Sequence, residues 1–220
     1  MKRIIRKFFS LEKKDQLIIF LLCTSICNFV VAIFKFVFSL TIPSMWFFIN
    51  AVFSFILSFS RIMTVKEYRK IRMLEDKELK MKLEYRNYLN NGIVLILLGI
   101  AYFFISSYMY YNGTNTTMHE YITYLVALIA FWSIGTAIYG TVKYKKNKEP
   151  IIKAVKLTNF ANALTSIVLT QVVLLDTFST GYDSSINGYT GMGVSLIIIF
   201  LGLYMILGIK KYLWRESKKC

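Results

Sequence analysis

Six long blocks of the chain contain no Asp, Glu, Lys, Arg or His, and charged residues gather in the segments between them. Each block is long enough for the roughly 20 apolar residues that a helix needs to cross about 30 Å of hydrocarbon. Because lipid offers the backbone no hydrogen-bond partners, such blocks must form helices rather than open strands. The blocks are 16–34, 36–60, 87–118, 121–142, 157–175 and 184–209.

The pattern predicts an all-α integral membrane protein with six transmembrane helices in a single domain, 1–220. Residues 64–90 are predicted to form a charged cytoplasmic loop between the second and third spans. Glu and Lys are mixed over 66–86 as in a solvated helix, which indicates that the two flanking helices continue into this segment. The predicted spans are 17–36, 45–63, 91–111, 121–143, 152–175 and 191–209.

Composition and charge refine this picture. An apolar content of 56% and a mean hydropathy of +0.52 exclude an ordinary soluble domain. The net charge of +15 is unevenly placed: apart from Lys35, all Lys and Arg lie before the first uncharged block, after the last, or in two of the longer connections. This alternation is the positive-inside pattern, and it predicts that both termini are cytoplasmic.

The same distribution bears on partners and location. A nucleic-acid footprint would cluster on one soluble module, so nucleic-acid binding is excluded. Basic loops beside a bilayer instead predict contact with anionic lipid headgroups. We expect a protein integral to the membrane, in a bacterial plasma membrane, with a homodimer as a further candidate partner and no cofactor.

Polar residues inside the predicted spans are the candidate functional residues. Lys35 near the outer end of span one has two interpretations: it snorkels to the interface, or it faces the bundle interior and pairs with polar groups. Span five carries a polar face, and Asn28 and Asn50 add amides in spans one and two. Such side chains either hydrogen-bond helices together or bind a solute. The span-five residues are Thr158, Asn159, Asn162, Thr165, Ser166, Thr170 and Gln171.

The sequence gives no support for catalysis. Its single histidine, His119, lies in an outer loop beside Glu120, with no nucleophile or second ligand nearby. The chain has no glycine-rich phosphate loop, no histidine-rich cluster and no Ser-His-Asp set. We therefore expect that the protein is not an enzyme.

Two stretches resemble the cation diffusion facilitator family. Asn28, Lys35 and the run 43–54 are similar to its first two spans, which read Lys, then Gly-Ser, then Ala-Leu-Leu-Ala-Asp-Ala-x-His-Ser-x-x-Asp. The basic loop 143–148 and the run 157–166 are similar to its basic loop and His-x-x-x-Asp-Ala-Leu-Thr-Ser in span five. The resemblance implies a six-span bundle of that family's type, in which spans two and five face each other.

The resemblance also implies where a metal ion would bind, and this chain departs from the family there. In the family, two residues of span two and two of span five hold a divalent ion tetrahedrally. The corresponding positions here are Phe53, Leu57, Thr158 and Asn162. None offers an anionic or imidazole ligand, so no metal site is predicted, and the family's cytoplasmic domain is missing too.

Three hypotheses follow. The first is a divergent cation-efflux-like transporter that moves a monovalent ion or a small polar solute past Lys35, Asn50, Thr158, Asn162 and Ser166. The second is a membrane scaffold or regulatory subunit of the same fold, in which these residues only hold helices together. The third is a transporter of zinc-like metals with a relocated site, whose candidate ligands are His119, Glu120, Asp176 and Asp183.

Overall fold

The computed structural model describes residues 13–41, 44–113, 120–143, 149–179, 183 and 185–217, and this part of the chain is helical without strands. All six helices contain segments long and apolar enough to cross a membrane, as expected of an all-α membrane protein. The helices are α2 (Lys13–Thr41), α3 (Met45–Arg72), α4 (Lys77–Asn112), α5 (Glu120–Lys143), α6 (Pro150–Phe178) and α7 (Ser185–Ser217).

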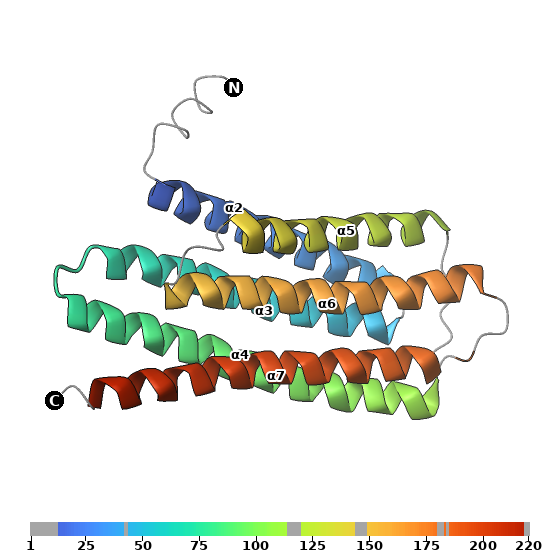
Figure 1. Cartoon of the computed structure of the whole chain (residues 1–220). Coiled ribbons are helices and arrows are strands. Elements are labelled where there is room, and N and C mark those ends of the chain that lie inside the picture. The colour runs from blue at the N-terminus through green and yellow to red at the C-terminus, as the bar shows by residue number, and fades with distance from the viewer. Residues whose placement is uncertain are drawn as a thin grey trace, which may run out of the picture.

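The six helices run alternately up and down (Figure 1). The start of α2, the turn between α3 and α4 and the end of α7 lie at one end of the bundle, which we call the basic end. An even number of antiparallel spans places both termini on the same side of a membrane. The positive-inside pattern assigns that side to the cytoplasm, and this assignment remains a prediction.

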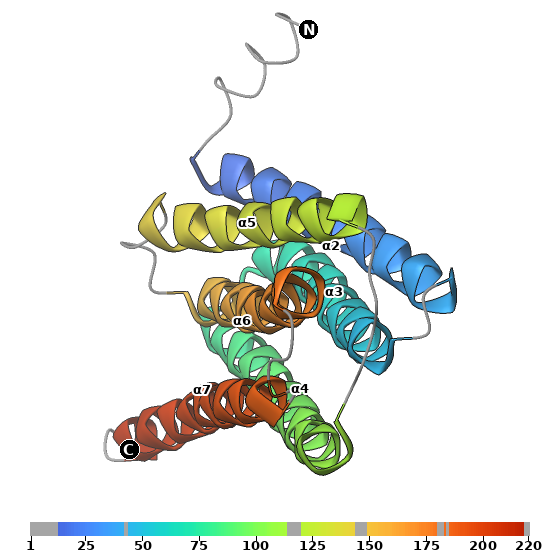
Figure 2. The same cartoon turned by 90° about the vertical axis from the view of Figure 1, so that its right-hand side faces the viewer.

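The helices form three layers of two, visible when the bundle is viewed from its end (Figure 2). Helices α2 and α5 make one outer layer, α4 and α7 make the other, and α3 and α6 lie between them. The most apolar windows of α3 and α6 are 56% buried, against 28–33% for the other four helices. Helices α3 and α6, which correspond to the predicted spans two and five, are therefore the central pair of the bundle.

The polarity of each helix explains its layer. Both central helices carry buried amides and hydroxyls along their whole length, and such groups are costly against lipid and therefore turn inward. The outer helices present large apolar side chains outward instead. Leu128, Phe131 and Phe200 are each about two-thirds exposed, as lipid-facing residues should be.

Small residues join α4 to α7. A Cβ built on Gly202 would lie 2.8 Å from the carbonyl oxygen of Gly92, and one on Gly99 would lie 3.3 Å from that of Ser195. The two backbones therefore approach more closely than any larger side chain would allow. Close packing at small residues is a main source of helix association in membranes, where lipid competes for apolar surface.

The charged segment between the second and third spans is helical rather than a loop. Helix α3 continues to Arg72, α4 begins at Lys77, and only residues 73–76 form the turn. Asp76 caps α4 by accepting hydrogen bonds from the backbone N–H groups of Glu78 (2.9 Å) and Leu79 (3.3 Å). The mixture of Glu and Lys had predicted this continuation of both helices into the charged segment 64–90.

Candidate functional site

Polar side chains fill the space between α3 and α6 in three tiers. The lysine tier is the one furthest from the basic end. Lys35 is only 5% exposed, and its Nζ donates to Asn50 Oδ1 at 2.6 Å and to Ser166 Oγ at 3.3 Å. Asn50 Nδ2 donates in turn to the carbonyl oxygen of Thr165 at 2.7 Å. Lys35 thus faces the interior, and the snorkelling interpretation is wrong.

The inward direction of Lys35 follows from the face it shares on α2. Ser25, Asn28, Ala32 and Ser39 are also buried, and their spacing of three or four residues places them on one side of the helix. A lysine on this stripe cannot reach the lipid interface without turning the whole helix. The periodicity of α2 was therefore a better guide than the distance of Lys35 from the end of the span.

The arginine tier lies two to three turns nearer the basic end, since Arg61 follows Asn50 by eleven residues of the same helix. Arg61 of α3 is completely buried. Its Nε donates to the carbonyl oxygen of Leu57 at 3.1 Å, its Nη2 to Ser58 Oγ at 3.3 Å, and its Nη1 to Asn159 Oδ1 on α6. The guanidinium therefore bends back toward the level of Ser58 and joins the two central helices.

Arg61 is a buried charged residue that the sequence analysis did not single out, because it lies close to the predicted end of span two. A signal was present, however. Asn50, Ser54, Ser58 and Arg61 are spaced by four, four and three residues, which places them on one face of α3.

The middle tier consists of Ser54 on α3, Asn162 on α6 and Ser133 on α5, all buried. Asn162 Nδ2 donates to Ser133 Oγ at 3.2 Å. Asn50 pairs with Thr165 and Arg61 with Asn159, and this antiparallel register places Ser54 at the level of Asn162. Ser54 Oγ and Asn162 Oδ1 are buried with no hydrogen-bond partner. Such atoms are rare in native interiors, and outside the tiers the described residues with one include Ser44, Tyr102 and Ser106. In the middle tier, two of them lie at the same level between the central helices.

The electrostatic character of the three tiers is positive. The hydrogen-bond acceptors of Lys35 and Arg61 are amides, hydroxyls and a carbonyl, and no carboxylate is among them in the described part of the chain. Asn50 and Ser58 are eight helical residues apart, so the two charged heads are about 12 Å apart along the axis. Two buried cations thus flank one uncharged polar tier.

The side chains at the positions that would hold a metal ion in the resembled family pack and hydrogen-bond within the protein. Phe53 packs its ring on Tyr102 of α4, with ring centroids 5.7 Å apart, and Leu57 is fully buried. The hydroxyl of Thr158 donates to the carbonyl oxygens of Ala154 and Val155 on its own helix.

The relocated metal site gains no support from the described residues. Among them, no three His, Cys, Asp or Glu side chains come together to hold an ion. His119 lies outside the described residues. Asp183 precedes α7 by two residues. The backbone N–H of Ser185 donates a hydrogen bond to its carboxylate at 2.9 Å, which lowers the pKa of that carboxyl.

A second polar cluster joins α3 to α4 near the basic end. Ser60 Oγ donates to Asn91 Oδ1 at 2.9 Å, and Asn91 Nδ2 donates to Thr64 Oγ1 at 2.8 Å. Asn87 accepts from Thr64 at 3.2 Å and donates to Glu67. These groups satisfy one another, as hydrogen bonds between membrane helices do, so this cluster has a structural role.

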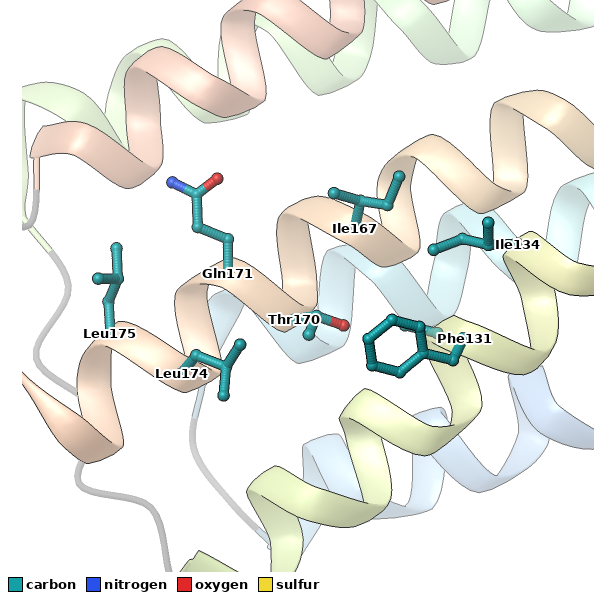
Figure 3. A pocket seen from close by; sticks show the side chains of 8 residues that line it. Phe131, Ile134, Ile167, Thr170, Gln171, Leu174 and Leu175 are labelled. Atoms are coloured by element: carbon teal, nitrogen blue, oxygen red, sulfur yellow. The ribbon is translucent and has the colours of Figure 1, made fainter.

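The open grooves on the bundle are apolar. One of about 340 Å³ lies between α5 and α6 and is lined by Phe131, Ile134, Ile167 and Leu174 among others (Figure 3). Its two polar residues point to partners elsewhere: Gln171 Nε2 donates to Thr190 Oγ1 at 2.9 Å and Thr170 donates to Ser166 O at 2.9 Å. This groove suits lipid rather than a polar solute.

No family model matches the chain, and a search of the curated proteins finds no match. Its function must therefore be inferred from its own residues. The three tiers are the part of the structure that carries chemistry.

Proposed function

We propose that this protein is a membrane transporter that moves a small polar solute or monovalent ion between α3 and α6. The observation that carries the proposal is the middle tier, where Ser54 Oγ and Asn162 Oδ1 are buried without partners between two buried cations. A group that only joins helices would have its hydrogen bonds satisfied, as those of the α3–α4 cluster are. Unsatisfied atoms at mid-depth are what a solute passing through would contact.

The family resemblance supports the same assignment. Six spans, a central pair formed by the second and fifth, and polar residues where that pair meets are what a divergent cation-diffusion-facilitator bundle would retain. On this proposal the protein lies in a bacterial plasma membrane with both termini in the cytoplasm. The cargo differs from the family's, because Phe53 and Leu57 cannot bind a metal ion.

The charges of the tiers limit which solutes the proposed transporter can carry. A unit positive charge midway between Lys35 and Arg61 would be about 6 Å from each, and the two repulsions sum to about 5 kcal/mol at an effective dielectric constant of about 20. Nothing on the neighbouring tiers offsets this, since their partners are neutral. We therefore assign the transporter a cargo without positive charge.

The alternative proposal is a membrane scaffold or regulatory subunit, and one observation favours it. Asn50 bridges Lys35 and the backbone of Thr165, so direct contacts close the lysine tier across α2, α3 and α6. In a transporter this tier would be a closed gate. In a scaffold it would be a permanent interhelical connection.

The variant Asn162→Leu separates the two proposals. Vesicles that contain the protein are mixed with urea, glycerol or a monovalent salt, so that they first shrink and then re-swell as the solute enters. For at least one solute, we expect faster re-swelling than in protein-free vesicles. Asn162→Leu should slow that flux about tenfold, because the solute loses a hydrogen-bonding group at mid-depth. Stopped-flow light scattering measures both rates.

Ser107→Ala provides the matched control. Ser107 is an intramembrane hydroxyl on α4, and it donates only to the carbonyl oxygen of Phe103, at 2.9 Å. Its removal should leave the flux unchanged. Vesicles no more permeable than lipid alone to every solute, with a protein that co-purifies in fixed ratio with another chain, would favour the scaffold.

A further inference from the structure

Lys35 and Arg61, the two buried cations, have N–H groups that form no hydrogen bond within the described residues. A guanidinium has five N–H donors, and three hydrogen bonds of Arg61 are formed in the described part of the chain. An ammonium has three, and Lys35 uses two. The partners already in place are neutral. Both positive charges and the remaining N–H groups are therefore available to something that accepts hydrogen bonds and is negative.

The neutral groups of the middle tier are able to donate as well. Ser54 carries a hydroxyl whose hydrogen is uncommitted. The amide of Asn162 contacts Ser133 Oγ, and a hydroxyl donates as readily as it accepts. The amide can therefore flip by 180°, which exchanges Oδ1 and Nδ2. Oδ1 then accepts a hydrogen bond from Ser133, and Nδ2 is presented toward the level of Ser54. A tier that offers only donors, between two cations, has the chemistry of an anion site.

We propose that the middle tier binds a small monovalent inorganic anion, such as a halide, between Lys35 and Arg61. This rests on the proposed function and names the class of its cargo. The size limit follows from the neighbouring tiers, since Lys35, Asn50 and Thr165 are in direct contact on one side and Arg61 closes the other. The same size limit disfavours sulfate and phosphate, which carry four oxygens around a central atom and are larger than a halide.

Anion-dependent thermal stability tests the site without requiring transport. The full-length protein in detergent is unfolded in sodium chloride, sodium nitrate and sodium gluconate at equal ionic strength. We expect a midpoint several degrees higher in chloride or nitrate than in gluconate, because an ion that binds only the folded state stabilises it. Lys35→Gln and Arg61→Gln should abolish this difference.

Two further variants keep the test decisive. Lys153→Gln removes an exposed lysine of α6 and should retain the full chloride effect. Ser54→Ala removes one middle-tier donor without touching either cation, so it serves if a cation variant does not fold. It should reduce the chloride effect. Equal midpoints in chloride and gluconate for the unmodified protein, or a chloride effect that survives in Ser54→Ala and both cation variants, would overturn the proposal.

Chloride efflux from vesicles separates this proposal from the one it rests on. We expect chloride to leave loaded vesicles about tenfold more slowly with Lys35→Gln than with the unmodified protein. Flux of urea or glycerol with no chloride effect on stability would overturn the anion site and leave the transporter intact. A chloride effect on stability with no flux of any solute would keep the anion site and overturn the transporter.

Discussion

Asn159→Leu should lower the free energy of unfolding by about 3 kcal/mol, because it removes the interhelical partner of a fully buried guanidinium. Arg61 would keep only Leu57 O and Ser58 Oγ, both on its own helix. Leucine has the branched shape of asparagine but a larger volume, so a double-mutant cycle is needed to separate the lost hydrogen bond from a change in packing. Thermal or denaturant unfolding in detergent measures it.

A double-mutant cycle identifies the cause of that loss. Arg61→Met removes the charge and leaves Asn159 Oδ1 without its donor, at a cost of about 1–3 kcal/mol. The double variant removes both partners and should be more stable than Asn159→Leu, because no buried charge is left unpaired. We expect a coupling of about 2 kcal/mol. Additive single effects would show that Arg61 and Asn159 do not depend on each other.

Gly202→Ala should destabilise the protein by about 1–3 kcal/mol, since the added methyl has no room between α4 and α7. A Cβ at this position would lie 2.8 Å from the carbonyl oxygen of Gly92 and 3.1 Å from the backbone nitrogen of Ile96. Both are backbone atoms, so the methyl can fit only if the helices move apart. The midpoint of thermal unfolding should fall by a few degrees.

Gly193→Ala is the matched control on the same helix. A Cβ on Gly193 would meet nothing within 4 Å. The exchange therefore adds only the intrinsic preference of alanine for helix, which is about 1 kcal/mol in favour of the variant. Equal effects of the two substitutions would contradict the close approach of α4 and α7 at Gly202.

The sequence predicts the helices well because membrane insertion imposes a single simple rule. Six uncharged blocks became six helices, and the family resemblance had implied that spans two and five, which form the central pair, face each other. The helix ends were less well predicted. Charged residues bound the apolar stretch and say little about where a helix stops in water, so α3 and α4 extend well beyond the predicted spans.

The candidate site was predicted only in part. Lys35 hydrogen-bonds to Asn50 and Ser166, as predicted by the interpretation in which it faces the bundle interior. Arg61 was missed, because the positive-inside pattern assigns a basic residue near the end of a span to the loop that follows. Its burial depends on where α6 places Asn159. The spacing along α3 places Arg61 on the polar face of that helix, but its pairing with Asn159 depends on the register between helices distant in sequence, which no local pattern encodes.

Access of water to Ser54 tests the transporter most directly. Ser54→Cys, made in a chain whose cysteines are replaced by serine, is treated in native membranes with a small water-soluble thiol reagent. Leu57→Cys, buried on the same helix among apolar residues, is the control. A route between α3 and α6 predicts that Ser54→Cys reacts much faster than Leu57→Cys from the aqueous phase. Equal, negligible reaction at both positions would contradict it and indicate a closed, structural core.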